Sequence, residues 1–296
     1  MMRFDQANNL RNLLDLRKRT EYLAPNSRVI TVTSGKGGVG KTNFAANLAV
    51  FLSDSGISSV VIDADLGLAN IEILLGCSPR FSLFDVMSGE MNIPDAVSES
   101  PWGVRFISGG NGLREIPNIS NYQLRNIMEN LVTLDSMTDV ILIDTGAGIS
   151  EPIIKFVKAS SETIIICTPE PTSITDAYSL IKTTRASLES GEGLPQFRVV
   201  VNQAEDEQEG YGIFKNLHRV ADSFLDVDLN YLGFIPFDYN LIKAVKQQVP
   251  VMLSFPETGF SKELRNIGAK LIDRPTQQTE KVGMRGFVRR LAGIFN

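Results

Sequence analysis

The chain has 296 residues, of which 43% are hydrophobic and 21% are charged, a composition that suits a globular protein with a sizeable core. Its net charge of −5 at pH 7 gives no overall attraction to nucleic acid, so no specific nucleic-acid partner is expected. Its two cysteines, Cys77 and Cys167, lie far apart in sequence and exclude a disulfide framework or a cysteine zinc site.

The first residues, MMRFDQANN, are too polar for a signal peptide. Residues 4–19 instead place Leu10, Leu13 and Leu14 at helical spacing, and the loop APNS follows. No apolar run in the chain approaches the roughly 20 residues that a membrane-crossing helix needs. We therefore expect a cytoplasmic protein with a separate N-terminal segment over residues 1–24.

Short runs rich in valine and isoleucine alternate with helix-patterned segments from residue 25 to residue 273. Such runs are typical of strands covered on both faces, as in a parallel sheet. They are VITVTS (29–34), SVVIDAD (59–65), VRFIS (104–108), DVILIDTG (139–146), TIIICTP (163–169), FRVVVN (197–202) and NYLGFIP (230–236). Helices are expected between them, for example over 42–56 and 176–190. The alternation predicts an α/β domain with a doubly wound, mostly parallel sheet flanked by helices.

A glycine-rich loop follows the first predicted strand. Residues 35–42, GKGGVGKT, fit the phosphate-binding pattern G-x-x-x-x-G-K-[ST] between a strand and a helix. Backbone N–H groups at a helix N-terminus attract phosphate oxygens, Lys41 should reach the β- and γ-phosphates, and the Thr42 hydroxyl should bind Mg²⁺. The residues expected to surround the phosphates are Gly35, Gly37, Gly38, Val39, Gly40, Lys41 and Thr42.

The same loop carries a second lysine, Lys36, which phosphate binding does not require. A solvated loop lysine is one interpretation. However, KGGVGKT resembles the deviant Walker A motif of the MinD/ParA/Soj family of ATPases. The resemblance implies ATP or ADP with Mg²⁺ as ligands, and a homodimer in which Lys36 touches the nucleotide of the partner subunit and acts in trans.

Acidic residues end the next predicted strands. The run SVVIDAD delivers Asp63 and Asp65 to the carboxyl edge of the sheet, where ligands bind in open α/β sheets. DADLGLAN resembles the family's switch I, which implies that Asp65 positions the attacking water and that Asp63 lies near the metal. DVILIDTGAG resembles Walker B and switch II, which implies that Asp144 belongs to the Mg²⁺ shell. The family often has proline at the position of Gly146.

The adenine pocket is expected at the ends of the last two predicted strands. An amide can read the N6 and N7 edge of adenine because it both donates and accepts a hydrogen bond. Asn202 resembles the family's adenine contact, and Pro236 and Asp238 resemble the loop that closes over the base. An ordinary turn is the alternative for these two residues.

The C-terminal end separates from the domain through a predicted linker, RPTQQTE, over residues 274–280. Residues 281–296 place apolar side chains on one helical face and carry four basic residues without an acidic one, which predicts an amphipathic helix that binds anionic lipids. Two such helices on an ATP dimer would bind by avidity. A helix docked on the core is the alternative. The predicted membrane residues are Phe287, Val288, Arg289, Arg290, Leu291, Ile294 and Phe295.

The N-terminal segment narrows the resemblance. DQANNLRNL (5–13) resembles the activating segment of the FlhG (YlxH, FleN) subfamily of MinD-like regulators, which stimulates the SRP-type GTPase FlhF. Gln6, Asn8 and Asn9 would reach into the GTPase, and Leu10 would anchor the helix. A plain helix packed on its own domain is the alternative. PEPTSITDAY (169–178) is similar to a connection of the same subfamily, and nothing in the chain resembles iron–sulfur cysteine ligands.

The sequence thus favours a MinD-like ATPase of the FlhG type. It would dimerise with ATP, bind reversibly to the inner face of the cell membrane, and control flagellar number and placement through FlhF and flagellar C-ring proteins. A DNA-bound partition ATPase of the ParA/Soj kind is the main alternative, and it predicts salt-dependent DNA binding. A small-molecule kinase and a non-hydrolysing scaffold are the others.

Overall fold

The computed structural model describes residues 27–65, 70–110, 121–189, 192–273 and 283–295. Its sheet has eight strands in the order β3-β4-β2-β5-β1-β6-β7-β8, and all pairings are parallel except that of β3 with β4. The strands are β1 (Arg28–Ser34), β2 (Ser59–Ala64), β3 (Ser98–Glu99), β4 (Arg105–Ile107), β5 (Val140–Ala147), β6 (Glu162–Cys167), β7 (Gln196–Ala204) and β8 (Leu229–Pro236). The predicted α/β class is confirmed, and every predicted run contributes a strand.

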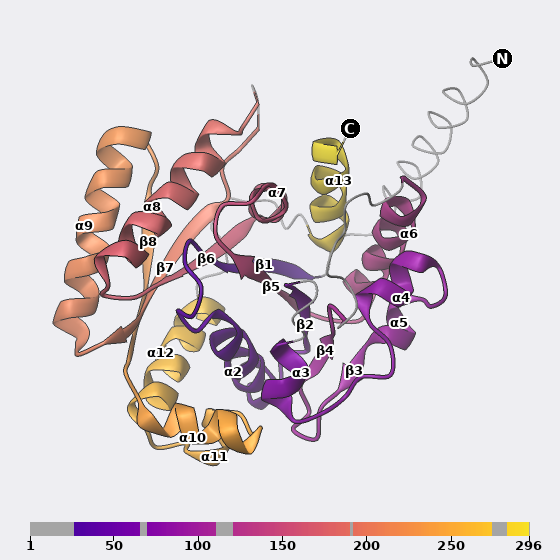
Figure 1. The fold of residues 1–296 in the computed structure, drawn as a ribbon, viewed down its shortest axis with the longest axis horizontal. Helices are drawn as coiled ribbons and strands as arrows, with labels where there is room; N and C mark the ends of the chain where they lie inside the picture. The colour runs from indigo at the N-terminus through magenta and orange to yellow at the C-terminus, as the bar shows by residue number, and fades with distance from the viewer. Residues whose placement is uncertain (1–26, 66–69, 111–120, 190–191, 274–282, 296) are drawn as a thin grey trace.

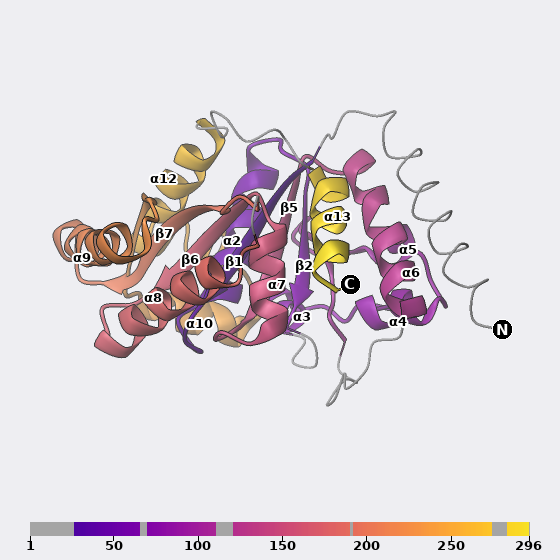
Figure 2. The ribbon, with the colours of Figure 1, turned by 90° about the horizontal axis from the view of Figure 1, so that it is seen from above.

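Helices flank this sheet on both faces (Figures 1 and 2). The helices of the first half are α2 (Lys41–Asp54), α3 (Asn70–Leu75), α4 (Leu83–Ser88), α5 (Ile93–Ala96), α6 (Asn121–Leu131), the 3₁₀ helix η1 (Val132–Ser136) and α7 (Glu151–Ala159). The later ones are α8 (Pro171–Ala186), α9 (Glu207–Leu225), α10 (Tyr239–Gln247), α11 (Val251–Ser254), α12 (Gly259–Asp273) and α13 (Gly283–Phe295). The short strand β3 was not predicted, because its two residues carry no periodic pattern.

The core is divided by the sheet. On one face, α2, α3, α10, α11 and α12 bury one apolar cluster against the strands. On the other face, α4, α6 and α13 share a second cluster, and α7, α8 and α9 form most of a third. The central strand β5 is buried on both faces over Val140–Ile143, which explains why its sequence is a continuous apolar run.

The carboxyl ends of three central strands meet at one edge of the sheet. Asp63 of β2 is the ladder partner of Asp144 of β5, and Asp144 is also the partner of Val32 of β1. The glycine-rich loop leaves β1 at this same edge, so the sheet register alone brings the predicted phosphate loop and the predicted carboxylates together. We refer to this edge as the carboxyl edge, and to the opposite side of the sheet as the amino edge.

The C-terminal helix does not stand apart from the domain, contrary to the expectation for residues 281–296. The helix α13 lies between α7 and α6 and also contacts η1 and β1 (Figures 1 and 2). Met284, Phe287, Val288 and Leu291 are at most 8% exposed, and the Phe287 ring stacks on Phe156 of α7 at 6.2 Å between centroids. Burying an apolar side chain of this kind contributes about 1.5–3 kcal/mol, so the apolar face has a strong reason to dock on the core.

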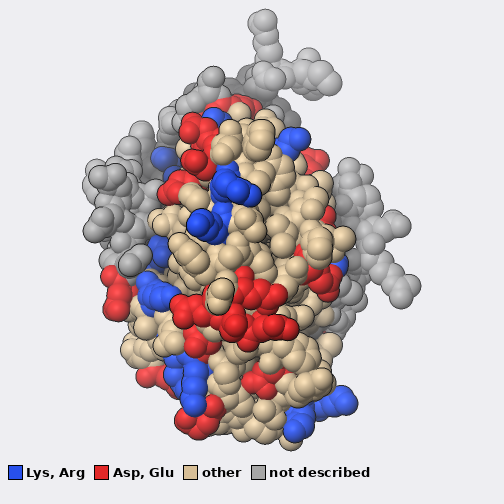
Figure 3. Space-filling model, turned by 90° about the vertical axis from the view of Figure 1, so that its left-hand side faces the viewer, with Lys and Arg blue, Asp and Glu red and all other residues tan. Residues whose placement is uncertain are grey.

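Acidic side chains form a band on the surface near α9 (Figure 3). Figure 3 shows the left-hand end of Figure 1, where acidic residues form a band and basic residues are fewer and scattered. A surface of this charge repels a phosphate backbone, in agreement with the net charge of the chain. The exposed acidic residues of α9 and its flanking loops are Glu205, Asp206, Glu207, Asp222, Asp226 and Asp228. Within the described parts of the chain, no helix is long and apolar enough to cross a membrane.

Candidate functional site

The glycine-rich loop is packed so closely that side chains would not fit at two of its positions. A Cβ on Gly35 would lie 2.2 Å from the carbonyl carbon of Asp176 in α8. A Cβ on Gly40 would lie 2.5 Å from Nδ2 of Asn202, and Gly40 has a φ of 93° at the start of α2. These close approaches bring the loop against β7 and α8 and explain the glycines on steric grounds.

The lysine of the phosphate-binding motif lies inside the site. Lys41 opens α2 and is only 8% exposed. Burial lowers the pKa of its ammonium group, while the nearby carboxylates of Asp144 and Asp65 raise it in part. The structure thus brings Lys41 into the field of the predicted switch carboxylates, as expected for a group that neutralises phosphate charge.

Asp144 is a buried carboxylate that lacks compensation. Asp144 is fully buried, and neither of its side-chain oxygens has a hydrogen-bond partner in the described chain. Burial is the main reason why the pKa of Asp144 rises to about 7, and the nearby Thr42 hydroxyl and Lys41 lower it less. The Thr42 hydroxyl is close but does not reach hydrogen-bond geometry. Orphaned carboxylate oxygens beside a hydroxyl are what a hard cation requires, so these residues fit Mg²⁺.

The two aspartates of the predicted switch I have different surroundings. Asp63 is fully buried, and its carboxylate accepts hydrogen bonds from the backbone N–H of Asp65 at 3.1 Å and of Ile71 at 3.3 Å. Burial raises the pKa of Asp63 to about 6 despite these bonds. Asp63 therefore holds the entry to α3 while it lies beside Asp144 in the sheet.

Asp65 lies against the predicted switch II. Its carboxylate accepts a long hydrogen bond of 3.4 Å from the amide of Asn70, and a Cβ on Gly146 would lie 3.1 Å from its Oδ1. A larger residue at position 146 would therefore require this carboxylate to shift slightly. Among the residues that the structure describes, no group of three or more His, Cys, Asp or Glu residues forms a metal cage, so a cation here needs phosphate oxygens and waters as further ligands.

The second lysine of the loop is bonded within its own chain. The Lys36 ammonium group pairs with the carboxylate of Glu170 and donates a hydrogen bond of 3.0 Å to the Thr172 hydroxyl. Both charged side chains are partly exposed, 36% for Lys36 and 61% for Glu170. Glu170 was not predicted as a partner of Lys36, although it lies in the segment PEPTSITDAY, because the two residues are 134 positions apart in the chain.

The residues expected to bind adenine form part of the same edge. Asn202 ends the regular part of β7 and donates a hydrogen bond of 2.7 Å from Nδ2 to the carbonyl oxygen of Val39 in the loop. A register shift follows, with Gln203 at a φ of 61°, and the backbone N–H of Gln203 donates to Oδ1 of Asn202. Pro236 ends β8, and the side chain of Asp238 caps α10. Contact with a base remains a prediction for these residues.

The terminal segments complete the placement of the predicted residues. Gln6, Asn8, Asn9 and Leu10 lie outside the described residues. In α13, Phe287, Val288 and Leu291 point into the core, Arg289 is exposed, and burial together with Arg289 lowers the pKa of Arg290. The side chains of Ile294 and Phe295 are not described.

Comparison with known proteins agrees with this geometry. The sequence profile of the ParA family, described as NUBPL iron-transfer P-loop NTPase, matches residues 26–272. The chain is 39% identical over 264 residues to the Antiactivator FleN of Pseudomonas aeruginosa, covering 89% of this chain and 93% of that protein. It is 30% identical to the Flagellum site-determining protein YlxH of Helicobacter pylori, covering 97% of this chain and 98% of that protein.

A solved structure shares the fold. The septum site-determining protein MinD of Pyrococcus horikoshii, complexed with Mg-ADP, superposes with a TM-score of 0.67 at 23% identity, covering 83% of this chain and 96% of that chain. The family match spans most of the described fold, including the loop, both switch aspartates and the Asn202 edge. The chain therefore belongs to the ParA/MinD family of P-loop NTPases, with the Antiactivator FleN and the Flagellum site-determining protein YlxH among its relatives.

Proposed function

We propose that this protein is a Mg²⁺-dependent ATPase that dimerises with ATP, binds the membrane reversibly through α13 and regulates the number and placement of flagella. The observation that carries the ATPase part is the orphaned carboxylate of Asp144 beside Thr42 and Lys41 at the carboxyl edge. The flagellar part is supported by the relative YlxH, whose name describes it as a flagellum site-determining protein.

The residues of the site divide the chemistry among them. Thr42 and Asp144 would hold Mg²⁺, with Asp63 behind them, and a bound cation would neutralise phosphate charge. The ammonium group of Lys41, which lies inside the site, would supply a positive charge to the phosphates. Asp65 accepts only a long hydrogen bond from Asn70 in the described chain, so its carboxylate can orient a water toward the reacting phosphate.

Dimerisation requires Lys36 to leave its partners in its own chain. The pair with Glu170 is exposed to solvent, and such pairs contribute about 0–1 kcal/mol, so a shared nucleotide can replace it at little cost. We infer that Lys36 exchanges Glu170 for the nucleotide of the second subunit when two copies meet across the carboxyl edge. The exposed Ile149, at 49%, follows switch II and is available to the same interface.

Membrane binding requires α13 to leave the core, because its apolar face is buried in the described state. The helix packs on α7, which begins directly after switch II, and Phe287 stacks on Phe156 of that helix. A rearrangement of switch II on dimerisation can therefore reach α13 through α7. Two released helices on one dimer would bind anionic lipids together, which is more favourable than two separate binding events.

The proposed protein partners rest on the resemblance of the N-terminal segment to that of the FlhG subfamily. We propose that residues 1–24, with Gln6, Asn8, Asn9 and Leu10, stimulate the SRP-type GTPase FlhF. Flagellar C-ring proteins are the further proposed partners. Localisation would then alternate between the cytoplasm and the inner face of the cell membrane, according to the bound nucleotide.

The test combines light scattering with vesicle sedimentation. With Mg²⁺ and a non-hydrolysable ATP analogue, the protein should be a dimer that sediments with phosphatidylglycerol vesicles, and with ADP it should be a monomer that does not. Lys36→Ala should remain monomeric with the analogue, and truncation after residue 282 should dimerise without binding vesicles. A monomer under all conditions would contradict the proposal. A dimer that binds DNA and not vesicles would favour the partition ATPase instead.

A further inference from the structure

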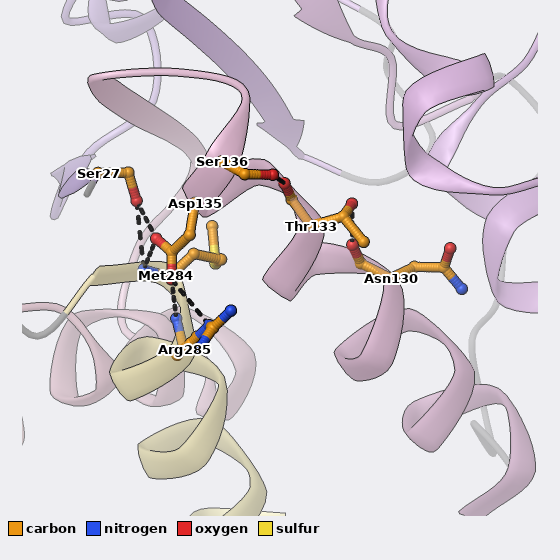
Figure 4. A network of polar contacts seen from close by, with 7 residues as sticks. All are labelled: Ser27, Asn130, Thr133, Asp135, Ser136, Met284 and Arg285. Carbon is orange, nitrogen blue, oxygen red and sulfur yellow. Dashed lines mark hydrogen bonds and ion pairs between the residues drawn. The ribbon is translucent and has the colours of Figure 1, made fainter. Parts of the chain in front are cut away.

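A buried carboxylate on η1 lies at the N-terminus of α13 (Figure 4). Asp135 is 5% exposed. Its Oδ1 accepts hydrogen bonds from the Ser27 hydroxyl and from the backbone N–H of Met284 at 2.7 Å. Its Oδ2 accepts one from the backbone N–H of Arg285 at 3.0 Å, and Nε of Arg285 lies 3.8 Å away. One carboxylate therefore receives donors from both ends of the described chain.

The contacts of Asp135 with α13 form a helix cap supplied from a distant residue. The first N–H groups of a helix have no partner within the helix, and a negative charge there also interacts well with the helix dipole. Asp135 is separated from Arg285 by 150 positions, so this cap exists only while α13 is docked. Release of α13 removes two backbone donors from Asp135 and exposes the first turn of the helix at the same time.

Ser27 makes the same carboxylate depend on the other end of the chain. Ser27 is fully buried directly ahead of β1, and its hydroxyl also lies 3.3 Å from the backbone nitrogen of Met284. A buried carboxylate that loses a donor is poorly compensated, which is costly in the interior of a protein. Loss of the Ser27 hydroxyl therefore weakens the cap without any change in α13 itself.

The neighbouring contacts fix Arg28 but leave Ser27 able to move. The next residue, Arg28, is fixed in the sheet by its ladder with Val140 and by two hydrogen bonds to Glu162, at 2.5 and 2.6 Å. Arg28 also donates a hydrogen bond of 2.6 Å to the carbonyl oxygen of Leu271 near the end of α12. In the part of the chain that the structure describes, the ladder of β1 begins only at Arg28 and Ser27 is held through its side chain, so Ser27 can be withdrawn while β1 stays in place.

We propose that Asp135 couples the two ends of the chain, so that a protein that grips the segment ahead of Ser27 and draws Ser27 away weakens the docking of α13. The inference rests on the proposed function, in which the N-terminal segment binds a GTPase and α13 binds a membrane. Because coupling between two binding events is reciprocal, a membrane that holds α13 strengthens partner binding at the other end by the same factor. Partner binding and membrane binding then reinforce one another.

Hydrogen exchange at the first turn of α13, in the full-length ADP-bound protein, directly tests the capping of α13 by Asp135. Asp135→Asn should raise the exchange rate by about tenfold, and Ser27→Ala by about threefold, because the first removes a charged cap and the second one of its donors. Ser136→Ala is the matched control: its hydroxyl bonds the Thr133 carbonyl on the same 3₁₀ helix at 2.9 Å and should change nothing at α13. Circular dichroism confirms that each variant is folded.

The double variant Ser27→Ala/Asp135→Asn separates a coupled network from two independent contacts. It should exchange more slowly at α13 than the product of the two single effects, about thirtyfold, because Ser27 acts mainly through Asp135 and only in part through its own 3.3 Å contact with the backbone N–H of Met284. Exchange in Ser27→Ala equal to that of the parent chain would overturn the proposal, and so would full additivity in the double variant.

A second measurement tests the coupling itself. Adding the FlhF GTPase to the parent chain should speed exchange at α13 and lower the amount of phosphatidylglycerol vesicle needed for half-maximal binding, by equal factors, and Ser27→Ala should show a smaller change. If the GTPase binds and α13 does not respond, the coupling is wrong and the proposed function stands. If truncation after residue 282 leaves vesicle binding unchanged, the proposed membrane role of α13 is wrong. The exchange rates of the variants then still show whether Asp135 and Ser27 hold α13 on the domain.

Discussion

The carboxyl edge and the amino edge of the sheet both bury carboxylates, but the two edges differ in the hydrogen-bond and ion-pair partners that they supply to them. At the carboxyl edge, both oxygens of Asp144 lack hydrogen-bond partners in the described chain. At the amino edge, Asp135 accepts hydrogen bonds from Ser27, Met284 and Arg285. At the same edge, Glu162 of β6 forms ion pairs with Arg28 and Arg198.

The difference shows what each edge is built to do. A buried charge without partners raises the free energy of the empty protein and favours any ligand that supplies a cation. A buried charge with several donors instead fixes the elements that provide those donors. The carboxyl edge is therefore prepared for a ligand, and the amino edge holds the two chain ends on the domain.

The largest expected effect comes from breaking the amino edge at Glu162. Glu162→Ala leaves the partly buried Arg28 and the buried Arg198 near each other without their shared anion, and should lower the free energy of unfolding by about 3–5 kcal/mol. Urea unfolding measures the loss, and Glu162→Gln should lose less because it still accepts hydrogen bonds. Nucleotide affinity of the folded variant should be unchanged. A cost below about 1 kcal/mol would show that this network does not hold the edge.

The next prediction compares the replacement of Asp144 by asparagine with the same replacement at Asp135. Asp144→Asn should lower ATP turnover by roughly 100-fold, about 2.7 kcal/mol, because the proposed Mg²⁺ ligand is lost, and should stabilise the nucleotide-free protein because a buried carboxylate without a hydrogen-bond partner in the described chain becomes a neutral amide. Asp135→Asn should do the reverse, with turnover unchanged and stability lower by about 1–2 kcal/mol. Turnover and thermal melting are measured on both proteins. Equal signs of the stability change in the two variants would remove the distinction between the edges.

The pH dependence of stability sharpens the comparison further. The pKa of Asp63 is raised to about 6 and that of Asp144 to about 7, above the value of 3.8 for an exposed carboxyl. Groups with a raised pKa in the folded state contribute full stability below the unfolded pKa, and that stability is lost as the pH rises through the folded pKa. The melting temperature of the nucleotide-free protein should therefore fall between about pH 4 and about pH 7. Asp144→Asn should flatten the curve, and a melting temperature that rises over this range would contradict the assignment.

The smallest expected effect concerns the exposed pair of Lys36 and Glu170. Glu170→Gln should free Lys36 and favour the ATP-bound dimer by about threefold per protomer, which is about ninefold for the dimer because two pairs must break. Light scattering across a concentration series with a non-hydrolysable analogue measures the shift. Thr172→Val, which removes only the neutral contact, is the control, and in a Lys36→Ala background Glu170→Gln should have no effect.

The sequence by itself determined the sheet and the chemistry of the carboxyl edge. Buried parallel strands require continuous runs such as VILI in β5, and the phosphate loop needs its glycines and Lys41 within a few consecutive residues. Asp63, Asp65 and Asp144 could be placed because they come at the end of recognisable apolar runs. These features are local, so their order along the chain is sufficient to predict them.

Only the tertiary structure decided where α13 lies and what Lys36 and Asp135 bind. An amphipathic pattern specifies an apolar face but not whether a lipid surface or the groove beside α7 covers it, because both remove that face from water. Lys36 meets Glu170 across 134 positions, and Asp135 meets Arg285 across 150, with no local signal at either residue. Contacts of this kind exist only after the sheet has brought distant segments together.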